Sequence, residues 1–366
     1  MGSATGLLLK ELGDFEADLF LGDSRVEKAQ AAARWIAEGA TKPGFVAAFH
    51  LPAAGTAPEV DALLGAADIL LDCLPGEQAP RMAQLARRHG LHYANLTEHV
   101  RETEAVKQIA AGAAEGYILQ TGLAPGFVNV LAMSLYRTFC REHGAGAVDR
   151  IVMRVGALTP AAQAPTFYAF TWSTIGVATE YVEPATVVRD FRRMVVPSLS
   201  ECRPIVIDGA LYEEDFTSGG AADLPAALEG KVRSLDYKTL RHPGHYDWVR
   251  RVLAAAPAGA DRAQYLDEQM QRSVPVADED LVVIHAAVER RSEDGFVRRL
   301  ESSRLIRPCT VGRHTLKAIQ ATTSAGLAES ARLLLTEGCR GICLQSEIDP
   351  HRFMSGPFVG RIFGTV

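Results

Sequence analysis

Residues 17–39 read ADLFLGDSRVEKAQAAARWIAEG, and this stretch decides the type of fold. It opens with a short apolar run, Ala17–Leu21, of the length expected for a buried strand. The periodicity of a helix follows over Arg25–Glu38, and Ser24 and Glu27 have the spacing of a capping box at its start. A strand that leads directly into a helix is the repeating unit of a parallel sheet.

The same alternation continues through the first third of the chain. Further short apolar runs predict strands, and amphipathic stretches between them predict helices. The predicted strands are Phe45–Phe49, Asp68–Cys73, Leu91–Leu96 and Tyr117–Thr121, and the predicted helices are Leu7–Leu12, Pro80–His89 and Val100–Ala114. Strands that alternate with helices indicate a parallel sheet covered on both faces, which is a Rossmann-type nucleotide-binding domain.

The pattern changes after Gly122. An amphipathic helix is predicted over Phe127–His143, and strand patterns such as Val282–Val288 and Phe296–Leu305 then dominate until a long helix at Leu316–Glu337. We expect an α+β substrate domain with a mostly antiparallel sheet. The predicted organisation is a nucleotide-binding domain of residues 1–121 and 313–345, a substrate and dimerisation domain of residues 122–312, and a C-terminal tail of residues 346–366.

Asp23 marks a candidate dinucleotide site. In such folds an acid at the end of the second strand, about 20 residues beyond the Gly-rich fingerprint, binds the ribose 2′-hydroxyl. Asp23 follows Gly2 by 21 residues, so Gly2 is a candidate for the last glycine of the fingerprint. The first strand and the first two glycines are then missing. The alternative is that Gly2 belongs to a polar start and Asp23 to an ordinary turn.

The cofactor candidates are the residues expected at the carboxyl edge of the parallel sheet and in the Gly-rich turn after it. They are Gly2, Ser3, Asp23, Ser24, Cys73, Leu74, Pro75, Gly122, Pro125 and Gly126. An acid at position 23 favours NAD, although Arg25 nearby would suit the 2′-phosphate of NADP. Cys73 is expected to be a packing residue rather than a nucleophile, because no basic residue is near it in sequence.

Composition limits the classes of function. The chain has 366 residues, a formal net charge of −6 and 22% charged residues, which disfavours nucleic acid or an anionic membrane as partner. Its six cysteines are too scattered for a disulfide framework. No His or Cys cluster has the spacing of a metal site, so we expect no metal. A cytoplasmic enzyme with a small-molecule substrate is the expectation.

Five strings together resemble the saccharopine dehydrogenase family, most closely its lysine 6-dehydrogenase branch. They are Gly122–Asn129, Phe170–Ser173, Val196–Glu201, Thr217–Gly220 and Tyr237–His245. The resemblance implies a nucleotide-binding domain with an inserted substrate domain, homodimerisation, and NAD(P)-dependent oxidation of an amine carbon in a lysine-derived amino acid. Two departures stand out: the incomplete glycine fingerprint, and Ile175 after Trp172-Ser173-Thr174, near which saccharopine-type members tend to carry an Arg.

The resemblance directs attention to the string Tyr237–His245. The substrate carboxylate needs a cation, preferably a guanidinium, and Arg241 is the candidate anchor. Amine oxidation needs a neutral nitrogen, so Lys238 or His245 is expected to handle a proton or to position the substrate. Charged residues in such a cluster can equally lie on a solvated face. The remaining substrate candidates are Tyr237, Trp172 as a wall, and Glu180 for the ε-ammonium group.

The favoured function is therefore an NAD(P)-dependent dehydrogenase of lysine 6-dehydrogenase type, acting on CH–NH2 or CH–NH donors. One alternative is a saccharopine dehydrogenase that acts on a secondary amine. Another is a catalytically impaired homologue that only binds a nucleotide, because the first strand and the Gly-rich loop are incomplete.

Overall fold

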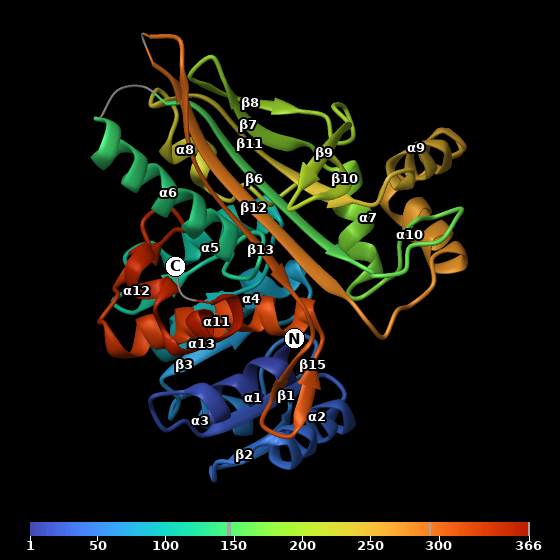
Figure 1. The fold of residues 1–366 in the computed structure, drawn as a ribbon. Helices are drawn as coiled ribbons and strands as arrows, with labels where there is room; N and C mark the ends of the chain where they lie inside the picture. Colours follow the sequence, from blue (N-terminus) through green and yellow to red (C-terminus); the bar gives the residue numbers. More distant parts are fainter. Residues whose placement is uncertain (145–147, 293, 365–366) are drawn as a thin grey trace. The chain divides into compact units, whose positions relative to one another are not determined.

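A computed structural model describes residues 1–144, 148–292 and 294–364 (Figure 1). The chain divides into two compact units. The first comprises the described residues of Met1–Leu123, Cys309–Leu316 and Gln320–Val366, and the second those of Ala124–Pro308 and Lys317–Ile319. The segment expected to be a tail carries two short helices, α12 (Pro350–Met354) and α13 (Pro357–Phe363), and it belongs to the first unit.

The first unit is built from alternating strands and helices. Its elements up to residue 123 are α1 (Gly2–Leu12), β1 (Leu19–Asp23), α2 (Val26–Gly39), β2 (Val46–His50), α3 (Pro58–Leu64), β3 (Ile69–Asp72), the 3-10 helix η1 (Gly76–Gln78), α4 (Ala79–His89), β4 (His92–Asn95), α5 (Val100–Ala110) and β5 (Gly116–Ile118). The hairpin β14 (Cys309–Val311) and β15 (His314–Leu316), most of α11 (Ala318–Thr336) and β16 (Gly341–Cys343) complete it. Strands β1 to β5 and β16 pair only in parallel, which confirms the predicted Rossmann-type parallel arrangement of strands.

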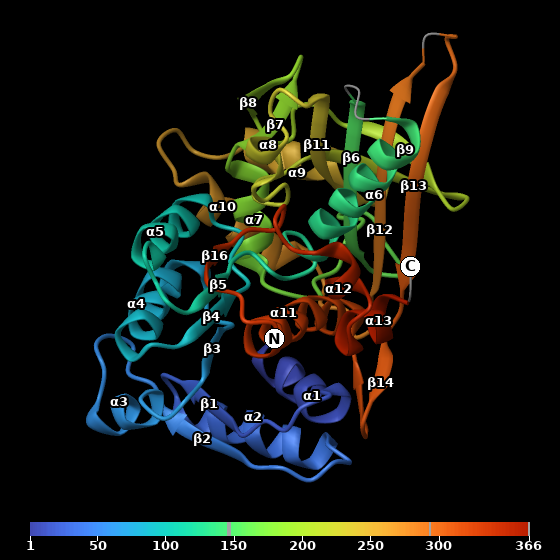
Figure 2. The same ribbon diagram turned by 90° about the vertical axis from the view of Figure 1, so that its left-hand side faces the viewer.

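These parallel strands form two separate sheets. Strand β1 pairs with β2, whereas the other four run in the order β16-β5-β4-β3 (Figure 2). In the common strand order 3-2-1-4-5-6 the first strand lies between the second and the fourth. When β1 and β3 are taken as the second and fourth strands, no described strand occupies the position between them.

The capping box predicted at Ser24 is wrong. Helix α2 begins after Arg25, which holds the N-cap position without a side-chain cap. The cause is the residue before Ser24: the Asp23 carboxylate accepts the backbone N–H of Arg25 at 2.9 Å, so the turn after β1 closes on Asp23.

The second unit surrounds one large sheet. Its elements are α6 (Phe127–His143), β6 (Val148–Leu158), α7 (Thr174–Val182), β7 (Ala185–Arg189), β8 (Arg192–Val196), β9 (Arg203–Ile207), β10 (Ala210–Phe216), α8 (Leu224–Ala227), β11 (Val232–Arg241), α9 (His245–Ala254), α10 (Arg262–Ser273), β12 (Leu281–Arg291) and β13 (Val297–Ile306). The main path is β13-β12-β6-β11-β10-β9, and only the β6–β11 pair is parallel. The predicted, mostly antiparallel sheet is confirmed.

Helix α6 packs against β6 and β12 on one face of this sheet (Figures 1 and 2). A second group, the aromatic cluster, joins α7, α9 and α10 around buried tyrosines, including Tyr168, Tyr181 and Tyr246. Strand β11 lies between β6 and β10, and its residues from Leu235 to Arg241 are buried.

Candidate functional site

Strand β11 separates the predicted site residues onto two faces. Successive side chains of a strand point to opposite faces of the sheet. Asp236 and Lys238 therefore share one face, and Tyr237, Thr239 and Arg241 share the other. All five are buried. The structure consequently does not bring Lys238 and Arg241, three positions apart, into one cluster.

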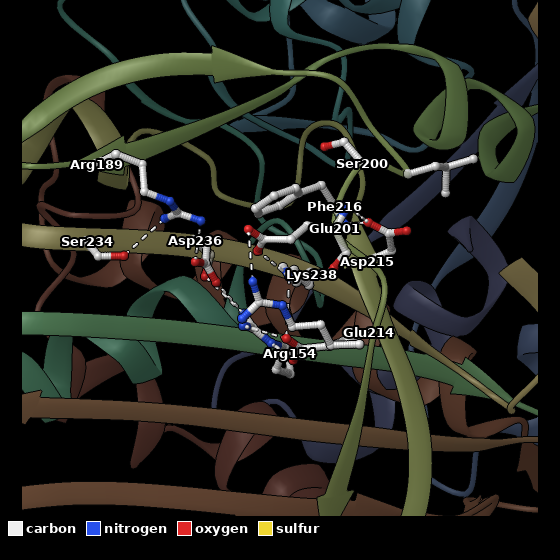
Figure 3. A network of polar contacts seen from close by, with 12 residues as sticks. Arg154, Arg189, Ser200, Glu201, Glu214, Asp215, Phe216, Ser234, Asp236 and Lys238 are labelled. Atoms are coloured by element: carbon white, nitrogen blue, oxygen red, sulfur yellow. Dashed lines mark hydrogen bonds and ion pairs between the residues drawn. The ribbon is translucent and has the colours of Figure 1, made fainter.

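The Lys238 face carries a network of ion pairs (Figure 3). The Lys238 Nζ atom donates to Glu201 Oε2 at 2.8 Å and to the Glu201 carbonyl at 2.9 Å. It also lies 3.5 Å from Glu214 Oε1 and 4.4 Å from the centre of the Phe216 ring. The ammonium group of Lys238 is thus surrounded by acceptors and an aromatic face, and is 1% exposed as a residue.

Arg154 on β6 lies beside Lys238 in the same network. Its guanidinium pairs with Glu214, and its Nη1 lies 2.8 Å from Asp236 Oδ1. The other Asp236 oxygen lies 2.9 Å from Arg189 Nη2. Burial alone would raise the pKa of the Asp236 carboxyl, but the charges of Arg154 and Arg189 outweigh burial and lower it. The charges of the network balance. Its three cations are Arg154, Arg189 and Lys238, and its three carboxylates are Glu201, Glu214 and Asp236.

Arg241, on the opposite face, has a different environment. It is 2% exposed, its Nε donates to the Tyr181 hydroxyl at 2.6 Å, and its Nη1 donates to the Leu240 carbonyl at 2.9 Å. Its guanidinium carbon lies 4.8 Å from the centre of the Tyr168 ring. No carboxylate in the described part of the chain forms an ion pair with it.

His245, the first residue of α9, is fully buried behind Arg241. Its Nδ1 lies 2.7 Å from the Thr166 carbonyl, and its Nε2 lies 3.0 Å from the Tyr181 hydroxyl. Burial and then the nearby charge of Arg241 lower the pKa of His245 to about 3. The imidazole is therefore neutral at physiological pH.

Asn129 ties two of the quoted strings together. Its Oδ1 accepts the Gly126 N–H at 2.8 Å, and its Nδ2 donates to the Gly220 carbonyl at 3.0 Å. Gly220 lies so close to the Tyr237 ring that a Cβ atom there would overlap it. Residues from three strings, around positions 126, 220 and 237, thus meet in the second unit.

Two further substrate candidates are on α7 and the turn before it. The carbonyl of Glu180 accepts the Ser218 N–H at 2.9 Å, and the negative charge of Glu180 is one of the influences that, after burial, raise the pKa of Tyr181 and Tyr237. Trp172 is half-buried and packs so closely on Gly176 that a Cβ atom there would clash with its ring. Glu180 therefore belongs to the Arg241 side of the sheet.

In the first unit, the cofactor candidates lie at the start of α1 and after the carboxyl ends of strands β1 and β3. Gly2 begins α1, and a Cβ atom there would lie 3.8 Å from Cys73 Cβ, just past the end of β3. Asp23 ends β1, and the Leu74 N–H donates to Asp72 Oδ1 at 3.0 Å. Desolvation of the thiol raises the pKa of Cys73 to about 11, in keeping with a packing role.

The other cofactor candidates lie in the turns around these residues. Ser3 and Ser24 follow Gly2 and Asp23, and Pro75 precedes η1. Gly122 belongs to the first unit, where its carbonyl contacts Gly326 of α11, whereas Pro125 and Gly126 belong to the second.

The sequence analysis did not single out several buried polar residues of these regions. In the first unit, Tyr93 donates to Asp72 Oδ2 at 2.8 Å, and burial raises the pKa of the Asp72 carboxyl. In the second unit it missed Arg154 and Tyr181. An arginine within the apolar run of β6 is the signal that would have identified Arg154, whereas Tyr181 has none, because α7 gives no clear sequence pattern.

Other classes of site receive no support from the described residues. Within them, no three His, Cys, Asp or Glu residues are grouped so that they could hold a metal ion. Helices long and apolar enough to cross a membrane are likewise absent from residues 1–144, 148–292 and 294–364.

Comparison with known proteins identifies the family. The model of the saccharopine dehydrogenase C-terminal domain matches residues 122–362. The apo saccharopine dehydrogenase (L-Glu forming) of Saccharomyces cerevisiae superposes with a TM-score of 0.72 at 15% identity, covering 97% of this chain and 94% of that one. The homospermidine synthase of Legionella pneumophila, in complex with NAD, superposes with a TM-score of 0.65 at 12% identity, covering 98% and 88%.

Proposed function

Because this chain belongs to the saccharopine dehydrogenase family, we propose that it is an NAD-dependent oxidoreductase that oxidises the amine-bearing carbon of an amino acid. Within that class we propose a substrate of lysine type, with Arg241 as the anchor of its carboxylate. The runner-up substrate is saccharopine, whose secondary amine would be oxidised instead.

The observation that carries this proposal is the environment of Arg241. A buried charge without a partner costs several kcal/mol, so buried guanidinium groups normally lie beside an anion. Arg241 is 2% exposed and, among the described residues, has no carboxylate in an ion pair. A substrate carboxylate would supply the missing anion.

The donors that remain on Arg241 fit a carboxylate. A guanidinium has five N–H groups. Tyr181 and the Leu240 carbonyl take one each, from Nε and Nη1. The three others include both hydrogens of Nη2 and one of Nη1, and this pair of nitrogens can bind two carboxylate oxygens side by side.

The other residues of this face would complete the contacts with an amino acid. We assign Glu180 to the ammonium group of the substrate, and Tyr237 and Trp172 to the walls beside it. A proton-handling role for Lys238 or His245 stays a prediction. Their contacts favour the alternative of a positioning role, because Lys238 is held by two carboxylates and His245 is neutral and hydrogen-bonded at both nitrogens.

The first unit offers residues that fit NAD. The first turn of α1, with Gly2 and Ser3, has no side-chain cap, so its N–H groups can face a pyrophosphate. The Asp23 carboxylate uses Oδ1 for the Arg25 N–H, which leaves Oδ2 for a ribose hydroxyl. The turn Cys73–Pro75 would lie beside the nicotinamide. When bound, NAD supplies the acceptor for the hydride that leaves the substrate carbon. NADP stays the alternative because of Arg25.

One Gly-rich turn, which begins with Gly122 in the first unit and includes Pro125 and Gly126 of the second, completes the assignment. We propose that the Gly-rich turn with Gly122, Pro125 and Gly126 also contacts the cofactor, because glycine lets backbone N–H groups approach a ligand. Homodimerisation through the strand-rich second unit stays a prediction of the family resemblance.

The test is NADH formation with matched substrates. L-lysine, saccharopine and 1,5-diaminopentane, which is lysine without its carboxylate, are compared for the wild type and for Arg241→Met. Loss of a charge-assisted hydrogen-bond pair is expected to lower kcat/KM for L-lysine by about 10- to 150-fold. The value for 1,5-diaminopentane should change less than about threefold.

Three results would alter the proposal. Faster turnover of saccharopine than of L-lysine would establish the runner-up substrate. An equal loss with all substrates in Arg241→Met would remove Arg241 as the carboxylate anchor. Absence of NADH with every amino acid, while calorimetry still detects NAD binding, would support the alternative of a catalytically impaired homologue that only binds a nucleotide.

A further inference from the structure

We propose that Tyr181, braced by His245, is a positioning residue that fixes the guanidinium of Arg241 for carboxylate binding. The inference rests on the proposed function, because that function assigns the carboxylate to Arg241. The Tyr181 hydroxyl lies between Arg241 Nε, at 2.6 Å, and His245 Nε2, at 3.0 Å. We call the chain Arg241–Tyr181–His245–Thr166 the brace.

The hydrogen bonds of the brace run in one direction. The Thr166 carbonyl can only accept, so the hydrogen of the neutral imidazole is on Nδ1 of His245. Nε2 then carries a lone pair and accepts the Tyr181 O–H. The oxygen of Tyr181 is left to accept from Nε of Arg241, which can only donate. Each group of the brace is therefore assigned as either donor or acceptor in each of its hydrogen bonds without conflict.

The surroundings keep His245 neutral and in one orientation. Aromatic rings enclose it, with centroids of Tyr168 at 4.9 Å, Tyr246 at 5.9 Å and Trp248 at 6.0 Å. The charge of Arg241 opposes a second proton on the imidazole, and no described carboxylate pairs with His245 to favour one. The acceptor that Tyr181 needs is thus present over the whole working pH range.

The brace does not transfer a proton. A relay needs a terminal group that takes up a proton, and this chain ends at the Thr166 carbonyl, which is a hydrogen-bond acceptor only. Burial also raises the pKa of Tyr181 far above neutrality. The brace orients Arg241 instead, because Nε of Arg241 donates to the Tyr181 hydroxyl and that hydroxyl in turn donates to Nε2 of His245.

The consequence for binding follows from the geometry of a planar guanidinium. With Nε held by Tyr181 and Nη1 held by Leu240, rotation of the Arg241 head is blocked, and the edge formed by Nη1 and Nη2 keeps one direction. A carboxylate then meets an anchor that is already ordered. Loss of the Tyr181 hydroxyl frees the head to rotate, and binding must order it again.

The test compares two buried tyrosines of the same aromatic cluster. Tyr181→Phe removes the hydroxyl of the brace. Tyr246→Phe is the matched control, because Tyr246 donates to the Thr239 carbonyl at 2.6 Å and does not hydrogen-bond Arg241. Tyr181→Phe loses the two buried hydrogen bonds of the Tyr181 hydroxyl, and Tyr246→Phe loses one. For Tyr181→Phe we expect about a tenfold higher KM for L-lysine, with kcat within twofold, and unchanged constants for 1,5-diaminopentane. Tyr246→Phe should keep the KM of the wild type.

Two further measurements separate positioning from folding. Arg Nε–H exchange, followed by 15N NMR, should be slow for Arg241 in the wild type and in Tyr246→Phe, and fast in Tyr181→Phe. His245→Gln, whose amide oxygen can accept from Tyr181, should retain more lysine affinity than His245→Ala.

The outcomes are distinct. If Tyr181→Phe and Tyr246→Phe shift KM equally, or if the Arg241 Nε–H stays protected in Tyr181→Phe, the brace is refuted while the proposed function stands. If the wild type forms no NADH from any amino acid, the proposed function fails and the role of the brace in substrate binding fails with it.

Discussion

Replacing Asn129 by alanine tests whether its side chain holds two loops of the second unit together. Asn129 is fully buried at the start of α6. Its amide joins the turn at Gly126 to the turn at Gly220 through hydrogen bonds of 2.8 and 3.0 Å. The alanine variant removes both bonds and provides no replacement partner.

The expected loss of stability follows from the polar groups that Asn129→Ala leaves without a hydrogen-bond partner. The Gly126 N–H and the Gly220 carbonyl would each lose a buried partner, at a cost of about 1–3 kcal/mol per group. We therefore expect Asn129→Ala to lower the free energy of unfolding by about 2–6 kcal/mol. Because Gly220 lies against the Tyr237 ring, kcat/KM for the amino acid should fall as well.

The assay is urea denaturation followed by tryptophan emission, since Trp172 and Trp248 both belong to the second unit. Glu142→Ala, on the exposed part of the same helix, is the control and should change the free energy by less than about 0.5 kcal/mol. If Asn129→Ala behaves like this control, the two hydrogen bonds do not hold the loops and the reasoning is wrong.

Two other predictions concern charge and packing. The pKa of Asp236 is lowered in the folded protein, so its carboxylate stabilises the fold above the unfolded pKa of about 3.9, and that contribution is lost as pH falls towards the folded value. Asp236→Asn should be less stable at pH 7 by about 3–5 kcal/mol. Its free energy of unfolding, measured by denaturation, should also depend less on pH between pH 5 and 3 than that of the wild type. If the free energies of variant and wild type fall equally over this range, the prediction is wrong. Gly356→Ala should overlap the Glu329 carboxylate, which accepts the Phe358 and Val359 N–H groups at the start of α13, and cost about 1–3 kcal/mol. Gly360→Ala in the same helix, where a Cβ meets nothing nearer than 3.5 Å, should be neutral; equal losses in thermal unfolding would count against the overlap.

Local periodicity was sufficient to predict most elements of the first unit. The predicted strand Phe45–Phe49 and helix Arg25–Glu38 correspond to β2 (Val46–His50) and α2 (Val26–Gly39), because burial on both faces of a parallel sheet leaves short apolar runs. The helix Phe127–His143 is confirmed with both its bounds. The capping box predicted at Ser24 is wrong because the Asp23 carboxylate closes the turn on the Arg25 N–H and helix α2 begins one residue later, after Arg25.

The ion-pair network could not be predicted from sequence. Arg154, Glu214 and Asp236 are distant in the chain. The apolar run around Arg154 indicates that this residue is buried, but charged residues are mostly exposed, and nothing in the sequence shows which carboxylates pair with it. Their burial depends on β6 pairing with β11 and on β10 pairing with β11, and such long-range pairing leaves no local signal. The same reason explains why Tyr181 was missed, since its partners Arg241 and His245 lie about 60 residues away.

The string Tyr237–His245 shows how an assigned strand changes a functional interpretation. Read as composition, its Lys, Arg and two His form one polar cluster. In strand β11, successive side chains point to opposite faces, so Lys238 and Arg241 lie on different faces of the sheet. Lys238 contacts carboxylates there, whereas Arg241 contacts tyrosines. A cation buried among carboxylates is already neutralised, whereas one buried among aromatic hydroxyls retains its need for an anion. This difference is the reason that we propose Arg241, rather than Lys238, as the anchor of an anionic substrate group.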